Sequence, residues 1–426
     1  MDFALDSGNT AWMIVATALV LLMTPALAFF YGGMVRTKSV LNMMMMSFIS
    51  IGVVAVVWVI YGYGLTFGSG RFIGDPSGFF GLNSIADTSS LAAGAGVPFL
   101  VMAAFQATFA IITVALISGS VADRMKFAAW MLFALVWVTL VYFPIAHAVW
   151  GGGILGWQND LTPSSPIDFA GGTVVHINAG AAGLALALVL GLRKGFGKEP
   201  MRPHNLPFVM LGAAILWFGW FGFNAGSEFA ADATAGRAFL NTLLAPAIAM
   251  LAWLLVERIR DGHATTLGAA SGVVAGLVAI TPAAASVDSW GALAIGVVAG
   301  VACAYAVGLK YKFGYDDSLD VVGVHLVGGL VGTLMIGLVA NLSEGTTWAG
   351  AGDPLVPKDG LFYGGGLDQL VTQSIAAVIA LAFSFIMTYL IALAIKHTIG
   401  LRVSEDVELA GIDFAEHGET AYEEAK

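Results

Sequence analysis

Apolar residues fill long stretches of the chain, and charged residues gather in the short segments between them. Several stretches run for about 20 residues without a charge, which is the length of helix that crosses the hydrocarbon core of a bilayer. By run length we expect eleven such spans. They cover residues 10–34, 42–67, 97–121, 127–149, 169–192, 206–227, 237–256, 265–281, 289–309, 321–340 and 369–395. The pattern therefore predicts an all-α polytopic membrane protein with eleven transmembrane helices.

Basic residues distinguish the two sides of this membrane protein. The chain holds 18 lysines and arginines, and all except Arg71, Arg237 and Lys358 follow odd-numbered spans. Because basic loops stay in the cytoplasm, we predict a multi-pass protein of the cell membrane with an external N-terminus and a cytoplasmic C-terminus. Residues 1–399 would form the transmembrane domain and residues 400–426 a cytoplasmic tail. Residues 1–6 lack the basic segment of a cleavable signal peptide, so we expect the first span to be retained.

Composition agrees with this class and argues against several others. Hydrophobic residues make up 58% of the chain and charged residues only 11%, whereas soluble domains carry about 25% charged residues. The net charge of −10 arises mostly from the loops and the tail, and nothing in it suggests nucleic-acid binding. The single cysteine, Cys303, leaves no internal disulfide. We see no nucleophile–base pair or metal-ligand set, so we expect neither an enzyme nor a cofactor.

Two histidines lie alone inside apolar segments, and each follows an aspartate by eight residues. Asp168 precedes His176, and Asp317 precedes His325, with Asp320 between them. A polar ring at hydrocarbon depth is costly and usually marks a substrate pathway or a proton relay. The matched positions of the two histidines indicate a conduit built by internal duplication.

Spans 1–5 and 6–10 form the two predicted halves, over residues 10–192 and 206–340, and span 11 is a final long helix. Each half has an odd number of spans, so the second half enters the membrane upside down, as in many transporters. Eight helical residues rise about 12 Å, which would bring each histidine near the middle of a core about 30 Å thick. Gly172, Gly180 and Gly329 would let the two helices approach closely. We therefore expect the histidine rings to meet.

Each of these features also has a plainer interpretation. A lone intramembrane histidine can simply bond a neighbouring helix. Two histidines can bind a metal, although no third ligand is spaced for one. An aspartate at the start of a helix caps free N–H groups and complements the helix dipole. We expect Asp168, Asp317 and Asp320 to act mainly as caps, with Asp168 also able to stabilise an incoming cation.

Aromatic residues collect at the predicted external face. Trp150 ends span 4, Phe223 and Ser227 end span 6, and Phe109 lies in span 3. Aromatic residues at a membrane face usually form an interfacial belt. Their ring faces also attract cations where they line the mouth of a pathway. The residues alone leave both interpretations open.

Taken together, these segments resemble the ammonium transporter family, the Amt, Mep and Rh proteins. The resemblance covers essentially the whole chain, including the tail from Gly400 to Tyr422. The matching strings are Phe29-Phe-Tyr-Gly-Gly-Met34, Ala122-Asp-Arg124, Ala146-His-Ala-Val-Trp-Gly-Gly-Gly153, Asp168-Phe-Ala-Gly-Gly-Thr-Val-Val-His176, Gly219-Trp-Phe-Gly-Phe-Asn-Ala-Gly-Ser227, Thr281-Pro282 and Val322-Gly-Val-His325.

The resemblance implies a homotrimer in the lipid bilayer, with one pore in each subunit and a tail that couples the subunits. It implies a cytoplasmic signalling protein of the PII type as a partner that plugs the inner mouth. It also assigns roles to individual residues of the site. Recruitment of ammonium falls to Trp150, Ser227, Phe109 and Asp168, gating to Phe109 and Phe223, pore lining to His176 and His325, and the pore entrance to Thr281.

The mechanism must separate ammonium from potassium, which has a similar size and the same charge. Ammonium donates directional hydrogen bonds and can lose a proton, whereas an apolar pore excludes every ion. We expect recruitment of the cation, deprotonation below the Phe gate and passage of ammonia along the histidines. The proton either follows along the histidines or returns outside, and the resemblance favours net transfer of one charge.

Two other functions compete with transport of this kind. An ammonium sensor often carries a signalling domain, but the roughly thirty residues after span 11 are too few for a kinase domain. An electroneutral channel for ammonia gas would not need the aromatic cation site at Trp150. Binding without flux would favour the sensor, and flux without current would favour the gas channel.

Overall fold

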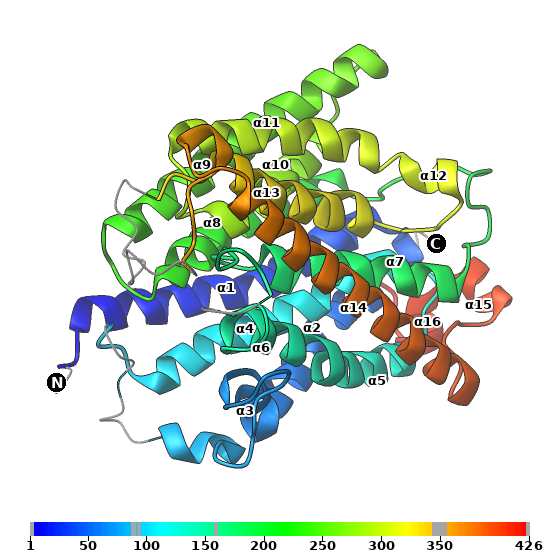
Figure 1. Cartoon of the computed structure of the whole chain (residues 1–426). Helices are drawn as coiled ribbons and strands as arrows, with labels where there is room; N and C mark the ends of the chain where they lie inside the picture. The colour runs from blue at the N-terminus through cyan, green and yellow to red at the C-terminus, as the bar shows by residue number, and fades with distance from the viewer. Residues whose placement is uncertain (1–3, 87–90, 92–94, 157–160, 343–355, 423–426) are drawn as a thin grey trace.

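The computed structural model describes residues 4–86, 91, 95–156, 161–342 and 356–422, and most of these residues are helical (Figure 1). This part of the chain contains no strands, only the isolated bridges Leu91–Pro98 and Met125–Arg402. Eleven of its helices are long and apolar enough to cross a membrane. The predicted all-α class and the predicted number of spans are therefore confirmed.

The membrane-length helices lie close to the predicted spans. Their bounds are Ser7–Met34, Thr37–Phe67, Phe99–Val121, Phe127–Trp150, Gly172–Leu190, Leu206–Glu228, Ala233–Arg260, Thr266–Ala283, Ser289–Phe313, Val322–Val339 and Asp368–Thr398. The α-helices are α1 (Ser7–Met34), α2 (Val40–Val57), α3 (Tyr63–Phe67), α4 (Phe99–Ile117), α5 (Phe127–Trp137), α6 (Phe143–Trp150), α7 (Asn178–Leu190), α8 (Leu206–Ala225), α9 (Ala233–Arg260), α10 (Thr266–Ile280), α11 (Ser289–Ala306), α12 (Leu309–Phe313), α13 (Val327–Val339), α14 (Asp368–Thr398), α15 (Glu405–Ala410) and α16 (Ile412–His417). Short 3-10 or π-helical turns are η1 (Thr37–Ser39), η2 (Trp58–Gly62), η3 (Phe80–Ile85), η4 (Ser118–Val121), η5 (Val138–Tyr142), η6 (Gly172–Ile177), η7 (Gly226–Glu228), η8 (Thr281–Ala283), η9 (Val322–Leu326) and η10 (Leu361–Tyr363).

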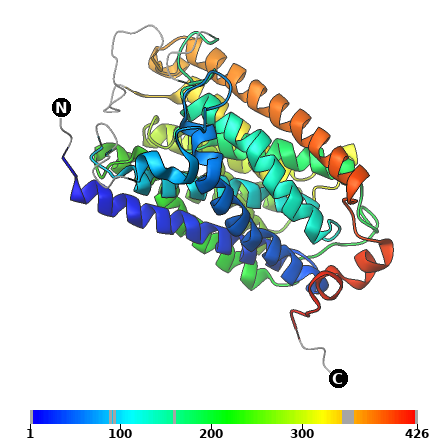
Figure 2. The same cartoon turned by 90° about the horizontal axis from the view of Figure 1, so that it is seen from below.

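The two ends of the helix bundle are distinct. The start of α1 lies at one end, and the tail helices α15 and α16 lie at the other, as both views show (Figures 1 and 2). We call these the N-terminal end and the tail end of the bundle. An odd number of spans requires this arrangement, whereas the side of the membrane that each end faces stays a prediction.

The first helices of the two predicted halves, α1 and α8, pack directly against each other. Glycines make their close approach possible, because a Cβ atom on Gly212 would lie 2.4 Å from the backbone nitrogen of Phe30. A Cβ atom on Gly219 would lie equally close to the Met23 side chain. Small residues at a helix contact replace side-chain packing by backbone packing, as is common in membranes.

Both histidines lie in π-helical turns, His176 in η6 before α7 and His325 in η9 before α13. The expectation that eight helical residues lead from aspartate to histidine is wrong. The backbone φ angles of 120° at Gly171 and 65° at Asp320 interrupt the helical conformation. The helices consequently begin at Gly172 and Val322, and each histidine lies about one turn inside its helix.

The tail folds back onto the tail end of the bundle. The carboxylate of Asp413 in α16 accepts hydrogen bonds from the backbone N–H groups of Leu41 (3.0 Å) and Asn42 (2.8 Å) at the start of α2. Nearby, Glu416 accepts a hydrogen bond from the backbone N–H of Phe127 at 3.0 Å, at the start of α5. These acceptors satisfy N–H groups that have no partner within their own helices. The tail is therefore part of the folded structure as far as Tyr422.

Candidate functional site

An open cavity of about 640 Å³ lies at the N-terminal end of the bundle. Aromatic and aliphatic side chains make up most of its wall, with a few polar side chains among them. The cavity brings together all four residues that were predicted to recruit ammonium: Phe109, Trp150, Asp168 and Ser227. Its aromatic and polar lining also includes Tyr63, Phe67, Phe79, Phe99, Gln106, Phe169 and Phe229.

Asp168 holds the wall of this cavity together. Its backbone carbonyl accepts a hydrogen bond from Nε1 of Trp150 at 2.8 Å. Its carboxylate accepts backbone hydrogen bonds from Gly171, Thr173 and Val174 at 3.0 Å each, and further bonds from the Gly172 N–H and the Thr173 hydroxyl. Burial raises the pKa of the Asp168 carboxyl, against the opposing effect of these donors. Asp168 thus caps η6 and orients the Trp150 ring.

Ser227 offers an acceptor to the cavity. Its hydroxyl donates to the backbone carbonyl of Phe223 at 2.8 Å. A hydroxyl has one hydrogen and two lone pairs, so Ser227 Oγ keeps its acceptor capacity. This arrangement favours a ligand that donates hydrogen bonds.

Two stacked phenylalanine rings close the floor of the cavity. The ring centroids of Phe109 and Phe223 lie 4.1 Å apart, and the ring planes are 20° from parallel. Both side chains are buried. Trp150 and Phe109 are nearly perpendicular, with ring centroids 6.0 Å apart. The predicted gate residues Phe109 and Phe223 therefore lie together, and Phe109 also lines the outer cavity with the other predicted recruitment residues.

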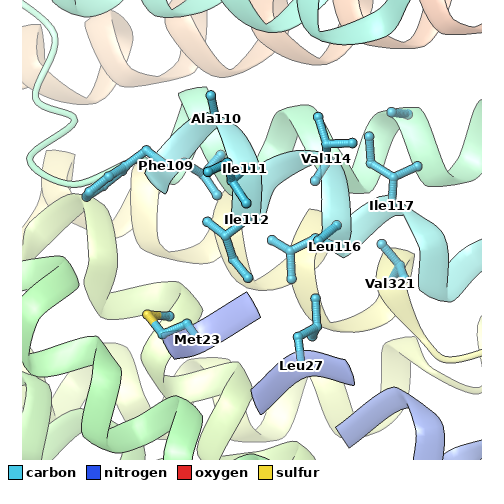
Figure 3. Packing of buried hydrophobic residues seen from close by; sticks show 14 of the residues in the cluster. Met23, Leu27, Phe109, Ala110, Ile111, Ile112, Val114, Leu116, Ile117 and Val321 are labelled. Atoms are coloured by element: carbon cyan, nitrogen blue, oxygen red, sulfur yellow. The ribbon is translucent and has the colours of Figure 1, made fainter. Parts of the chain in front are cut away.

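A narrow cavity follows on the other side of the Phe pair. Its volume of about 10 Å³ has room for about one water molecule. Its lining is apolar except for the two histidines, and in Figure 3 Ile112 and Leu116 of α4 point toward Met23 and Leu27 of α1. The remaining lining residues are Phe30, Val175, Leu216, Trp220, Phe223 and Val274. A bare ion would lose its hydration here without replacement.

The two histidines meet inside this narrow cavity. Their Nδ1 atoms lie 3.3 Å apart, and their rings are stacked with centroids 5.4 Å apart. Nε2 of His176 has no hydrogen-bond partner among the described residues. The pair therefore combines one internal hydrogen bond with a ring nitrogen, Nε2 of His176, that has no partner in the described part of the chain.

Trp220 contacts this pair, although the apolar pattern of its span did not single it out. Its ring stacks on His176 at a centroid distance of 5.5 Å and an angle of 20°. Its Nε1 donates to the hydroxyl of Thr281 at 2.8 Å. The helical spacing from Trp220 to Phe223 on α8 was the one signal in the sequence that both rings share a face.

Thr281, which we predicted at the pore entrance, lies beside the Trp220 ring. It is fully buried, and it does not line the outer cavity. Its hydroxyl donates to the Leu277 carbonyl at 2.7 Å and accepts from Trp220. Thr281 thus bonds the Trp220 ring, which stacks on His176, and its role at the pore entrance stays a prediction.

Glycines let the two histidine helices touch. A Cβ atom on Gly180 of α7 would lie 2.4 Å from the backbone nitrogen of Leu326. A Cβ atom on Gly329 of α13 would lie 3.1 Å from Cβ of His176. The predicted close approach of the two helices at these positions is present in the structure.

Asp317 and Asp320 were both expected to cap the helix that begins with η9, and only one of them does so. The carboxylate of Asp317 accepts hydrogen bonds from the backbone N–H groups of Val321 (3.1 Å) and Val322 (2.7 Å). The expectation that Asp320 is a cap is wrong, because its carboxylate instead pairs with Nζ of Lys310 at 2.7 Å. Burial raises the pKa of Asp317 to about 6, although Lys310 acts in the opposite direction.

His147 is a further buried histidine near the cavity. Its Nδ1 lies 2.9 Å from the Thr66 carbonyl and its Nε2 lies 3.0 Å from the Gly70 carbonyl. These contacts tie α6, one turn before Trp150, to the end of α3. No group of three or more metal-ligating side chains is present in the part of the chain that the structure describes.

Known proteins are similar to this chain over nearly its whole length. A sequence model of the Ammonium Transporter Family matches residues 11–422. The ammonium transporter of Mycobacterium tuberculosis strain H37Rv is 58% identical over 439 residues, which cover 98% of this chain and 91% of that protein. The ammonium transporter of Aquifex aeolicus strain VF5 is 48% identical over 428 residues, or 98% of this chain and 94% of that protein.

Solved structures show the same similarity. The crystal structure of Mep2 from Candida albicans superposes with a TM-score of 0.85 and 34% identity, over 98% of this chain and 90% of that chain. A structure named Sensor Amt Protein has a TM-score of 0.85 and 28% identity, over 96% of this chain and 98% of that chain. The chain belongs to the ammonium transporter family, whose members are membrane transporters and not enzymes.

Proposed function

We propose that this protein moves ammonium across the cell membrane through the two cavities, with the N-terminal end outside. The observation that carries the proposal is the direct contact of His176 and His325 below the stacked Phe109 and Phe223 rings. An aromatic cavity suited to a cation thus leads to a narrow apolar cavity suited to a neutral molecule. Ammonium is a substrate that can exist in both forms.

Recruitment takes place in the outer cavity. Ammonium donates a hydrogen bond to Ser227 Oγ and lies against the faces of Trp150 and Phe109, which attract a cation by about 0.5–2 kcal/mol each. Asp168 stabilises the site from behind, because it holds Trp150 and the start of η6 in place. The aromatic rings attract potassium as well, but potassium cannot donate a hydrogen bond to Ser227.

Selection is completed beneath the Phe gate. Ammonium loses its proton there, and ammonia continues through the narrow cavity past His176 and His325. Potassium has no neutral form, so the apolar lining excludes it. The rings of the histidine pair each have one nitrogen that donates and one that accepts in the neutral form, which suits them to relay the proton. Transfer of the proton in the same direction as ammonia gives net movement of one charge.

Assembly and regulation follow the family pattern in this proposal. The protein forms a homotrimer with a pore in each subunit, and the tail end faces the cytoplasm. A signalling protein of the PII type binds at the tail end and plugs the inner mouth. The basic residues that follow odd-numbered spans support this orientation.

An ammonium sensor is the second candidate, because a structure named Sensor Amt Protein is similar over 96% of the chain. A sensor needs the outer cavity but not flux. An electroneutral ammonia channel, the third candidate, needs the narrow cavity but no charge transfer. The aromatic cavity around Trp150 favours a pathway that first binds the cation.

Flux and current together separate the three candidates. Purified protein is reconstituted in liposomes, and transport is followed with an internal pH dye and, in parallel, on a solid-supported membrane. We expect a saturable current with ammonium, a smaller one with methylammonium and none with potassium. Ammonia flux without current would contradict the proposal and favour an electroneutral gas channel. Ammonium binding without flux or current would contradict it and favour a sensor.

A further inference from the structure

The tail end of the first histidine helix is held by cationic side chains. The last carbonyls of a helix have no partner within it, and positive charge near them is stabilising. Four successive carbonyls at the end of α7 each accept a hydrogen bond from a lysine or an arginine. These bonds are Lys396 to Val189 (3.2 Å), Arg402 to Leu190 (3.2 Å), Arg124 to Gly191 (3.0 Å) and Arg402 to Leu192 (2.7 Å).

Arg124 differs from the other two cations in what else it contacts. It lies in the loop between α4 and α5 and is fully buried. A guanidinium has five N–H donors, and each of the five meets an oxygen from one of three segments. The acceptors are the carbonyls of Ser120 and Ala122 (both 3.2 Å) after α4, Gly191 (3.0 Å) after α7, and the Asp316 carbonyl and Ser318 hydroxyl (both 2.5 Å) before η9.

Asp316 and Ser318, which Arg124 contacts, lie in the segment that leads directly to the turn containing His325. Asp317, between the two contacted residues, caps η9 through the N–H groups of Val321 and Val322. His325 lies within the same π-helical turn. On the other side, α7 continues without a break from η6, which contains His176.

An ion pair reinforces this connection. Arg193, which follows α7, places its guanidinium 2.8 Å from the carboxylate of Asp316. Its backbone N–H also donates to that carboxylate at 2.7 Å. Both residues are buried. Burial alone would raise the pKa of Asp316, but Arg193 and Arg124 outweigh it and lower that pKa, so the carboxylate stays ionised.

We propose that Arg124 is a positioning residue of the pore, which fixes the end of the His176 helix against the start of the His325 helix. The distance between the two imidazoles then depends on a side chain that contacts neither of them. The effect of Arg124 on transport rests on the proposed function. The positions of the two imidazole rings can be measured independently of transport. A shift of about 1 Å in the position of a reacting group can lower the rate about a hundredfold.

The test compares Arg124→Lys with Lys396→Gln. Lysine keeps the charge but cannot form the five-donor fork, so it releases some of the three segments. Lys396→Gln removes a cation from the same end of α7 without touching the segment before η9, and it is the matched control. Full-length protein with ¹⁵N-labelled histidine is reconstituted in nanodiscs, and the ring-nitrogen signals of His176 and His325 are recorded beside ammonium flux.

Arg124→Lys should shift the ring-nitrogen signals of both histidines and reduce flux on the order of tenfold, an ångström-scale misplacement effect. Lys396→Gln should leave the signals unchanged. Unchanged histidine signals in a folded Arg124→Lys protein would overturn the proposal, whatever happens to its stability. If the wild type itself carries no ammonium flux, the proposed function fails, while the histidine signals still decide the role of Arg124.

A milder variant covers the case in which Arg124→Lys does not fold. Ser318→Ala removes one of the five acceptors and leaves the other four in place. It should shift the His325 signals more than those of His176, because Ser318 lies on the His325 side. Equal signals for Ser318→Ala and the wild type would overturn the proposal.

Discussion

The Nδ1 atoms of His176 and His325 lie 3.3 Å apart, so one of these two nitrogens donates a hydrogen and the other accepts it. In the neutral pair, the donating ring then has its lone pair on Nε2, and the accepting ring carries its hydrogen there. The two imidazoles are therefore unequal at any moment. A proton that passes along them leaves both rings in the opposite tautomer, so each transport cycle must reset the pair.

The first prediction concerns recruitment at Ser227. Removal of its hydroxyl in Ser227→Ala takes away the hydrogen-bond acceptor for the cation. Because a hydrogen bond to a charged group contributes about 1.5–3 kcal/mol, the half-saturating ammonium concentration should rise on the order of tenfold. Maximal current should change little, because the narrow cavity is untouched. Ser227→Thr keeps a hydroxyl and should keep the wild-type value; an unchanged half-saturation in Ser227→Ala would remove this residue from recruitment.

The second prediction concerns the support of His176 by Trp220. Thr281→Val removes the acceptor of the Trp220 Nε1–H group, which is buried. An unpaired buried donor costs about 1–3 kcal/mol, so the variant should unfold at a lower temperature in detergent and carry less ammonium. Thr281→Ser keeps the hydroxyl and serves as the control. Equal melting temperatures for the valine and serine variants would argue that Trp220 finds another partner.

The third prediction concerns the close contact of the histidine helices. Gly180→Ala places a methyl group where an ideal Cβ lies 2.4 Å from the Leu326 nitrogen, so the helices must separate. We expect a lower melting temperature and a large loss of ammonium flux. Gly52→Ala in α2 is the control, since nothing lies within 4 Å of its Cβ and alanine favours a helix over glycine by about 1 kcal/mol. Wild-type flux in Gly180→Ala would contradict the role of this contact.

The fourth prediction concerns Asp317 and pH. Burial raises the pKa of Asp317 from 3.8 to about 6. The folded protein thus binds this proton more tightly than the unfolded chain, and the stabilisation from this group is lost as pH rises from 3.8 to about 6. Melting temperatures across this window should fall less steeply with pH in Asp317→Asn than in the wild type. Parallel profiles of the two proteins would refute the shift.

The sequence alone predicted the membrane spans and the contact between the two histidines. Apolar run length determines the spans, and the matched positions of His176 and His325 after their aspartates predict that the two rings meet. The sequence was not sufficient for the helix starts, because the apolar pattern carries no signal for the positive φ angles at Gly171 and Asp320. The ion pair of Asp320 with Lys310 is likewise a tertiary contact.

Other parts of the site were hidden by the apolar composition itself. Within a span, Trp220 looks like any lipid-facing tryptophan, and only the fold shows that its ring stacks on His176. Thr281 was expected at the pore entrance, but its partners Trp220 and Leu277 belong to the histidine pocket and to α10. Arg124 reads as an ordinary basic loop residue, because its acceptors come from three segments far apart in the chain.

The central claim is that the histidine pair carries selective ammonium transport. The most direct measurement is the ammonium-evoked current of the wild type, His176→Leu and His325→Leu, reconstituted in equal amounts on a solid-supported membrane, with potassium as the comparison ion. We predict a saturable ammonium current in the wild type, no potassium current, and no ammonium current in either leucine variant. Full ammonium current in both variants would contradict the account.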